Sequence, residues 1–300
     1  MVLLDGGMGQ ELIARSVNPA HPLWSAKVMM DEPEIVCEIH QDYLRAGATV
    51  LTLNTYSATP ERLARDGFAD SFKTLQKRAI ELAKQAIEQT RADAAIAGCL
   101  SPLFASYRPD VAPPYPEMLD LYRQIVAEQA ESVDLFLCET LASVAEIRAA
   151  TTAAVESGKS VWVAMTLNDG TAAPELRSGE PFADGISAAV ENGAAAVLGN
   201  CSWPESISAG FDDLSASQIF WGAYANGFTS INPMQPGGTV DELAARDDLN
   251  PESYCDWAMT AIEHGASIIG GCCEVGPAHI AAIASRFQAN GYQVTKDLHA

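Results

Sequence analysis

Residues 135–166 read LFLCETLASVAEIRAATTAAVESGKSVWVAMT, and this stretch decides the fold. It opens with the apolar run 135–138, continues through 143–157 with apolar side chains at helical spacing, and closes with a second apolar run at 161–166. Strands of a parallel sheet are buried on both faces, so they read as continuous apolar runs. Gly158 follows the helical stretch, as is typical of a helix C-terminus. The stretch therefore predicts a β-α-β unit with two parallel strands.

The same alternation runs along the whole chain. Strands are predicted at 2–4, 49–54, 95–99, 135–138, 161–166, 195–200, 218–224 and 267–270. Helices are predicted at 34–47, 68–89, 116–132, 143–157, 182–192, 251–264 and 277–288, with loops at 107–116 and 226–238. Eight strands alternating with helices predict an α/β fold of the closed (β/α)8 type, a TIM barrel, with an open doubly wound sheet as the alternative. No linker interrupts the pattern, so residues 1–300 are expected to form one domain.

Composition narrows the class of protein. The chain has 300 residues, 48% of them hydrophobic, and a formal net charge of −21. Binders of nucleic acid and anionic membranes need Lys and Arg, so neither partner is expected. The N-terminus does not read as a secretion signal, and no run of about 18 apolar residues is present, which predicts a cytoplasmic protein. Seven cysteines in such a protein favour metal binding or burial over disulfides.

Polar and thiol groups gather where the predicted strands end. Active sites of α/β barrels form at the C-terminal ends of the strands. Those ends read Asp5-Gly6-Gly7, Asn54-Thr55-Tyr56, Cys138-Glu139-Thr140, Asn200-Cys201, Tyr224-Ala225-Asn226 and Cys272-Cys273. The sequence therefore predicts a functional site that draws on most of the barrel rim.

The sharpest set is formed by Cys201, Cys272 and Cys273. Three thiolates with one open position suit catalytic Zn2+, and Gly270-Gly271 before the pair could let both sulfurs turn toward one point. A buried or vicinal pair without chemical importance is the alternative, and spacing alone does not decide between them. The other cysteines are expected to be packing residues.

Two carboxylates stand out at the strand ends. Asp5 and Glu139 could be ion-paired rim residues, or they could hold a substrate ammonium group. The Gly6-Gly7 turn offers backbone N–H groups that could hold a carboxylate. A nucleotide site is disfavoured because the full Gly-x-Gly-x-x-Gly pattern is missing.

Taken together, these strand ends resemble the homocysteine S-methyltransferase family, which also includes betaine-using enzymes. The resemblance is carried by DGGMGQEL at 5–12, PLWSA at 22–26, HQDYLRAGA at 40–48, NTYSATPERL at 54–63, CETLASVAEIRAA at 138–150, GNCSWPE at 199–205 and GGCCEVGPAHI at 270–280. The segments between PLWSA and NTYSATPERL are most similar to the branch that uses S-methylmethionine or S-adenosylmethionine.

The resemblance implies a barrel enzyme that moves a methyl group from a sulfonium donor to the homocysteine thiol and so makes methionine. It implies a Zn2+ cofactor held by Cys201, Cys272 and Cys273. Asp5, Gly6 and Glu139 match positions that hold the amino-acid part of homocysteine. The remaining matched positions are asparagines near the metal, expected to bind substrate: Asn200 and Asn226.

The chain departs from the family pattern where a donor would approach. Ser101-Pro102-Leu103 stands in place of Gly-Pro-Tyr, and Glu274 follows the cysteine pair. Tyr56 or Trp203 could face a cationic donor, since aromatic faces attract sulfonium and ammonium groups. Betaine or a dimethylsulfonium acid therefore stays open as donor. Two other functions stay open as well: a non-catalytic zinc- or thiol-binding barrel, and a redox protein with a Cys272–Cys273 disulfide.

Overall fold

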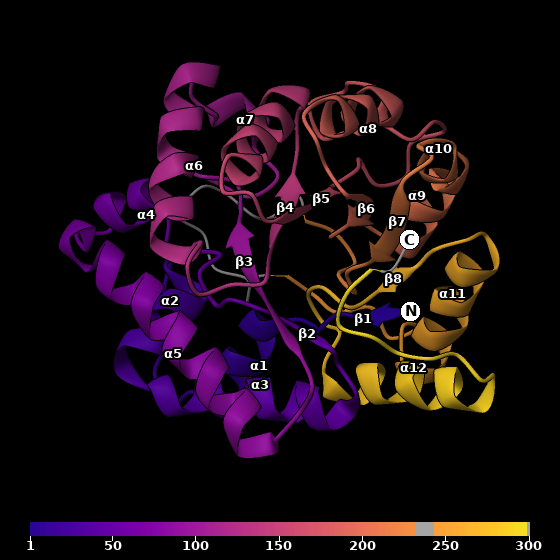
Figure 1. The fold of residues 1–300 in the computed structure, drawn as a ribbon, viewed down its shortest axis with the longest axis horizontal. Helices are drawn as coiled ribbons and strands as arrows, with labels where there is room; N and C mark the ends of the chain where they lie inside the picture. The colour runs from indigo at the N-terminus through magenta and orange to yellow at the C-terminus, as the bar shows by residue number, and fades with distance from the viewer. Residues whose placement is uncertain (232–242, 299–300) are drawn as a thin grey trace.

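The computed structural model describes residues 1–231 and 243–298, in which eight parallel strands form a nearly closed barrel (Figure 1). The strands are β1 Val2–Leu3, β2 Val50–Thr52, β3 Ala95–Leu100, β4 Leu135–Leu141, β5 Ser160–Met165, β6 Ala196–Asn200, β7 Phe220–Tyr224 and β8 Ile268–Ile269. Their order is β1-β8-β7-β6-β5-β4-β3-β2, and a parallel bridge between Leu4 and Val50 joins the two ends of this order. The TIM-barrel prediction is thereby confirmed, and all eight strands lie where they were predicted.

Alternate residues of the strands fill the barrel interior. One core cluster consists of side chains spaced two apart along the strands, such as Ala95 and Ala97, Leu135 and Leu137, and Trp162 and Ala164. The residues between them point outward into a larger core beneath the helices. Both faces of each strand are therefore apolar, which explains the continuous apolar runs in the sequence.

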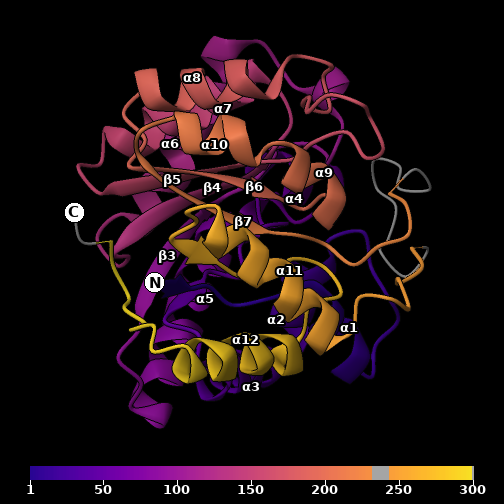
Figure 2. The ribbon, with the colours of Figure 1, turned by 90° about the vertical axis from the view of Figure 1, so that its right-hand side faces the viewer.

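A ring of helices surrounds the barrel, and Figure 2 shows α12 lying between α11 and α3, which closes the ring. The seven predicted helices are confirmed as α3 Pro33–Ala46, α5 Phe72–Thr90, α6 Tyr115–Gln129, α7 Val144–Val155, α8 Phe182–Glu191, α11 Pro251–Glu263 and α12 Pro277–Ala289. Gly47 ends α3 in the left-handed region, at φ +108°, as expected of a glycine helix stop. None of the helices in the described ranges is long and apolar enough to span a membrane.

Several short helices were not predicted. They are α1 Met8–Arg15, α2 Trp24–Asp31, α4 Pro60–Arg65, α9 Pro204–Ala209 and α10 Phe211–Ala216, with a 3-10 turn at Pro109–Val111. The helix predicted at 68–89 begins with a 3-10 turn, Ala69–Ser71, before α5. Helices of one or two turns show too little periodicity to be recognised. The predicted loop 226–238 lies partly outside the described residues.

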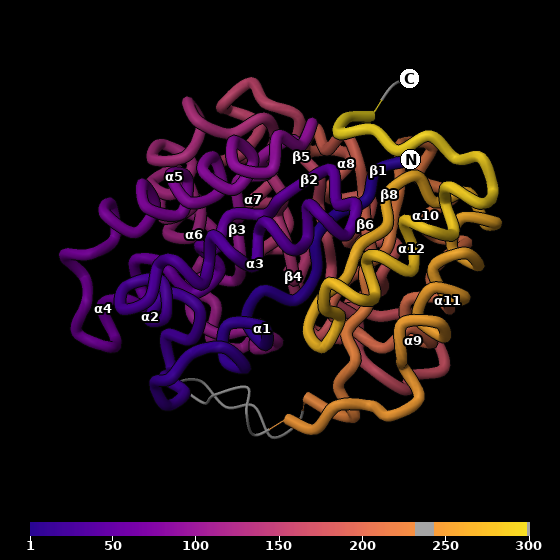
Figure 3. Tube along the Cα trace, turned by 90° about the horizontal axis from the view of Figure 1, so that it is seen from below, coloured from indigo at the N-terminus to yellow at the C-terminus, as the bar shows by residue number. Residues whose placement is uncertain are grey.

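The two ends of the chain meet on the side of the barrel where the strands begin (Figure 3). The Thr295 backbone N–H donates to the Met1 carbonyl, and Thr295 also bridges to Val2 of β1. The C-terminal segment therefore covers the bottom of the barrel, and the opposite end is left for the site.

Candidate metal centre and substrate cavity

A cavity opens at the C-terminal ends of the strands. It is lined by residues from the ends of β1, β2, β4, β6, β7 and β8 and from the segments that follow these strands and β3, among them Asp5, Gly6, Gly7, Gln10, Trp24, Tyr56, Tyr107, Glu139, Cys201, Tyr224, Cys272 and Cys273. The site thus lies at the rim predicted from the strand ends.

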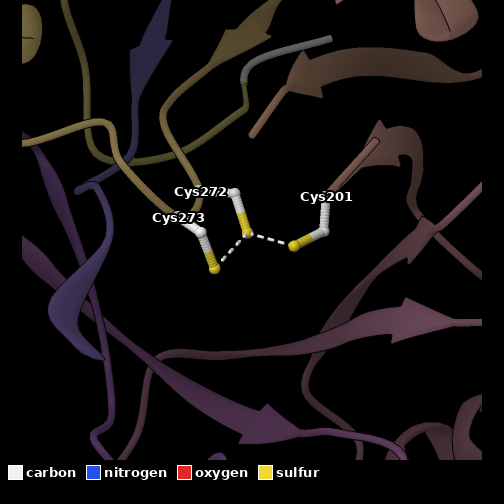
Figure 4. A group of neighbouring side chains, drawn as sticks. All are labelled: Cys201, Cys272 and Cys273. Atoms are coloured by element: carbon white, nitrogen blue, oxygen red, sulfur yellow. Dashed lines mark hydrogen bonds between the residues drawn. The ribbon is translucent and has the colours of Figure 1, made fainter. Parts of the chain in front are cut away.

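The three predicted cysteines converge at one side of this cavity (Figure 4). Cys201 follows β6, and Cys272 and Cys273 lie in the turn after β8. The Sγ atom of Cys272 lies 2.6 Å from that of Cys201 and 4.0 Å from that of Cys273. All three Sγ atoms lie within 4.8 Å of one another, so the group could hold a metal ion.

The backbone around the β8 turn explains this convergence. A Cβ atom on Gly271 would lie 2.2 Å from a methyl carbon of Val275, and one on Gly270 would lie 2.6 Å from Cβ of Leu4. Only glycine allows so close an approach. The Cys272 N–H then donates to the Ala225 carbonyl at 3.0 Å, which ties the turn to the end of β7.

The three thiols differ in pKa because they hydrogen-bond to one another. Burial raises the pKa of the Cys201 thiol, but hydrogen bonds from Cys272, Cys273 and Tyr107 lower it by more, so the pKa falls well below 9.0. The pKa values of Cys272 and Cys273 are raised, chiefly because each hydrogen-bonds to Cys201. Cysteines bind metal as thiolates, so three converging cysteine sulfurs are a donor set that suits a soft or borderline cation with sulfur preference, such as Zn2+.

Glu139 lies across the cavity from the cysteine pair, on β4. Its Oε1 accepts a hydrogen bond from the Cys99 thiol at 3.0 Å, and its Oε2 accepts one from the Tyr224 hydroxyl at 3.3 Å. Burial, with a contribution from the charge of Cys201, raises the pKa of Glu139 to about 7. Cys99 is therefore more than a packing residue, because its thiol orients this carboxyl.

Asp5 is buried at the end of β1. Its two oxygens accept hydrogen bonds from the Thr52 backbone N–H at 2.8 Å and the Thr52 hydroxyl at 3.0 Å. Burial, together with the charge of Glu139, raises the pKa of Asp5 to about 7. Gly6 follows it, and a Cβ there would lie 2.1 Å from the Val275 carbonyl oxygen, so this position requires glycine.

The two predicted asparagines are fully buried and are not among the residues that line the cavity. Asn200 pairs with Thr140: its Oδ1 accepts from the Thr140 N–H at 3.1 Å, and its Nδ2 donates to the Thr140 hydroxyl at 2.9 Å. Thr140 has φ +60°, at an irregularity of β4 beside Glu139. Asn226 accepts from the Phe228 N–H at 3.3 Å, whereas its Nδ2 has no hydrogen-bond partner within the described protein.

The aromatic residues divide into two groups. Tyr56 lines the cavity with its ring perpendicular to that of Trp24, and the Arg62 guanidinium lies 5.4 Å from the Tyr56 ring centroid. Trp203 is not in the cavity lining; its Nε1 donates to the Phe228 carbonyl, and Arg246 covers its ring.

Among the lining residues that were not predicted from the sequence are Gln10, Trp24 and Tyr107. Trp24 stands in the PLWSA segment, which could have pointed to it. The loop that carries Tyr107 offered no comparable signal.

Comparison with known proteins agrees with this geometry. The family model for homocysteine S-methyltransferase matches residues 2–287. The homocysteine S-methyltransferase of Escherichia coli is 31% identical, covering 95% of both chains. Betaine–homocysteine S-methyltransferase 1 of Mus musculus is 28% identical, covering 95% of this chain and 71% of its own length.

The solved structures give the same result. The metallated form of the homocysteine methyltransferase MmuM from Escherichia coli superposes with a TM-score of 0.79 at 28% identity, covering 95% of this chain and 96% of the other. Sequence and fold therefore agree over nearly the whole length, and the chain belongs to the homocysteine S-methyltransferase family.

Proposed function

We propose that this protein transfers a methyl group from a sulfonium donor to the thiol of homocysteine, with Zn2+ held by Cys201, Cys272 and Cys273. The observation that carries the proposal is the convergence of these three sulfurs within 4.8 Å at the wall of the cavity. When bound there, Zn2+ would favour the thiolate form of the substrate sulfur, which is the nucleophilic form.

The two buried carboxyls are assigned to the ammonium group of homocysteine. The pKa values of Glu139 and Asp5 are both raised to about 7. The charge of Glu139 contributes to the rise at Asp5, so the two carboxylates repel each other across the cavity. A cation between them would favour the charged form of both. The backbone at Gly6 would approach the same amino acid closely, because no side chain intervenes.

Asn200 and Asn226 are assigned supporting roles at the substrate site. Asn200 fixes the bend in β4 that aims Glu139, through its two hydrogen bonds to Thr140. Asn226 lies beside the turn that carries the cysteine pair, since the adjacent Gly227 N–H donates to the Cys273 carbonyl at 2.9 Å.

The chemical step needs little acid–base help from the chain. The homocysteine thiolate attacks the methyl carbon, a new S–CH3 bond forms, and the C–S bond of the sulfonium breaks. The electron pair leaves with the second sulfur as a neutral sulfide, and the thiol proton has gone to solvent before the attack. Positive and negative charge cancel in this step, so a water-poor cavity favours it, and the protein's contribution is to hold the two sulfurs in line.

S-methylmethionine or S-adenosylmethionine is the proposed donor. The wall formed by α1 and α2 presents Trp24 Nε1 and both amide atoms of Gln10 without hydrogen-bond partners in the described protein. These groups would satisfy the polar end of a donor that is itself an amino acid. Betaine and dimethylsulfonium acids are the alternatives to compare directly.

The metal assignment predicts the behaviour of Cys273→Ser. This variant should lose at least tenfold in zinc affinity and most of its methionine-forming activity, because one of three thiolate ligands is gone. Cys255→Ser is the matched control, since Cys255 is buried in α11 and is not one of the three cysteines grouped at the cavity. Metal analysis and a donor panel with homocysteine are the measurements. Retention of zinc and full activity in Cys273→Ser would contradict the proposal.

A further inference from the structure

Cys201 has a backbone conformation that a residue with a side chain rarely adopts. Its φ is +47°, in the left-handed region, which a non-glycine residue keeps only where its surroundings hold it. A cysteine assigned to a metal therefore stands in a strained position. The residues that hold it there belong largely to the segment after β5, which sequence reasoning did not connect with the site.

A buried ion pair in that segment holds the backbone around Cys201. Asp169 and Arg177 pair at 2.8 Å, with only 10% and 7% of their side chains exposed. The other oxygen of Asp169 accepts from the Trp203 N–H at 2.8 Å, two residues after Cys201. Arg177 Nε donates to the Thr166 hydroxyl at 3.2 Å.

The same arginine is also linked to the Cys201 sulfur, because it packs on the ring of a tyrosine whose hydroxyl contacts that sulfur. The Thr166 hydroxyl, which accepts from Arg177, donates to the Cys201 carbonyl at 3.1 Å and so holds the backbone of Cys201 itself. On the side-chain side, the Arg177 guanidinium lies 5.2 Å from the Tyr107 ring centroid, and the Tyr107 hydroxyl oxygen lies 3.0 Å from Cys201 Sγ. Thr166 thus contacts the Cys201 carbonyl, and Tyr107 contacts the Cys201 sulfur.

The direction of the Tyr107 hydrogen bond follows from its surroundings. A phenol has a pKa of about 10, so the Tyr107 hydroxyl keeps its proton at neutral pH. A thiolate can only accept, so the hydroxyl donates to the sulfur whenever Cys201 is ionised.

We infer that Tyr107, held by the buried Arg177–Asp169 pair, is a positioning residue that fixes the Cys201 sulfur and donates a hydrogen bond to its thiolate. This inference rests on the proposed function, in which Cys201 is a metal ligand. Partners of metal ligands orient them and tune their donor strength, and their loss typically costs 10- to 100-fold in metal affinity. A hydrogen bond to the sulfur withdraws charge from it, which lets the metal accept more from the substrate thiolate.

Tyr107→Phe tests this directly, because it keeps the ring beneath Arg177 and removes only the hydroxyl. Tyr122→Phe is the matched control: Tyr122 is fully buried and its hydroxyl donates to the Ser101 carbonyl at 3.1 Å. Zinc affinity is measured by chelator competition, and the sulfur-to-metal charge-transfer band is recorded on Co2+-substituted protein. Tyr107→Phe should bind zinc 10- to 100-fold more weakly and shift the band, whereas Tyr122→Phe should do neither.

A second pair of variants tests the role of Arg177. Arg177→Met should weaken zinc binding as much as Tyr107→Phe or more, and Arg177→Lys should restore part of it by keeping the pair with Asp169. Wild-type affinity and an unshifted band in Tyr107→Phe would overturn the inference while leaving the proposed function intact. Failure of the wild-type protein to bind zinc at all would overturn both.

Discussion

The proposed pairing of Glu139 with the substrate ammonium can be tested directly with a neutral variant of this residue. Glu139→Gln keeps the size and one acceptor oxygen but removes the charge. A hydrogen bond to a charged group contributes about 1.5–3 kcal/mol, so KM for homocysteine should rise about 10- to 100-fold while zinc content stays unchanged.

The control is Glu146→Gln. Glu146 is also a buried carboxyl with a pKa raised to about 7 by burial, but it accepts from the Ala142 N–H and the Ser143 hydroxyl at the start of α7. Its variant should leave KM unchanged. An unchanged KM in Glu139→Gln would remove this carboxyl from the substrate site.

The sequence identified the residues of the site that carry distinctive chemistry. Each of these residues follows an apolar run, so barrel topology alone places them on one rim: Asp5, Glu139, Cys201, Cys272 and Cys273. It did not identify residues that act through orientation. In the sequence, Tyr107 and Arg177 belong to no motif that links them to the site. Only the folded chain brings Tyr107 to Cys201 and Arg177 to Tyr107.

The bend in β4 belongs to the scale of secondary structure. Asn200 on β6 satisfies both the N–H and the hydroxyl of Thr140, and Thr140 follows Glu139 directly. Asn200→Ala leaves these buried groups unpaired, which should lower the free energy of unfolding by about 1–3 kcal/mol. KM for homocysteine should also rise, because Glu139 is no longer held, and zinc should remain bound.

Asn192→Ala is the matched control for this change. Asn192 caps the end of α8, its side chain donates to the Ala188 carbonyl at 2.7 Å, and it is not among the residues that line the cavity. It should lower stability without changing KM. Denaturant unfolding, steady-state kinetics and metal analysis separate the outcomes. A loss of stability in Asn200→Ala with wild-type KM would show that the bend does not aim Glu139.

Strands and long helices were predictable because their apolar patterns are long enough to recognise. The seven predicted helices span 10 to 19 residues, from α8 to α5. The helices that were missed, such as α1 and α2 with eight residues each, build the cavity wall that carries Gln10 and Trp24. Their short length and their position directly at the site left little periodicity to read, so the wall beside the proposed donor was the least predictable part.

For the whole molecule, His40 makes folding stability depend on pH. It is fully buried in α3, neither ring nitrogen has a hydrogen-bond partner in the described protein, and burial lowers its pKa from 6.5 to about 4. As pH falls, His40 therefore becomes protonated in the unfolded chain at a higher pH than in the folded chain. Folding stability is lost as pH falls from about 6.5 toward 4. Between pH 7 and pH 5 this histidine should cost about 2 kcal/mol.

The measurement is the free energy of unfolding of wild type and His40→Leu at both pH values. Asp5 and Glu139, whose pKa values are raised, act in the opposite direction, so the difference between the two proteins isolates the histidine. His40→Leu should lose about 2 kcal/mol less than wild type on acidification. His264→Leu at the exposed end of α11 should follow wild type. Equal losses in wild type and His40→Leu would exclude His40 as the source.

The barrel brings Cys201, which follows β6, close to Cys272 and Cys273 in the turn after β8, and the proposed zinc site depends on this convergence. Zinc K-edge X-ray absorption on the loaded protein, before and after addition of homocysteine, tests it most directly. Three sulfur neighbours at about 2.3 Å are expected without substrate, and four with it. A zinc environment dominated by nitrogen and oxygen, or a sulfur count that does not change when homocysteine binds, would contradict it.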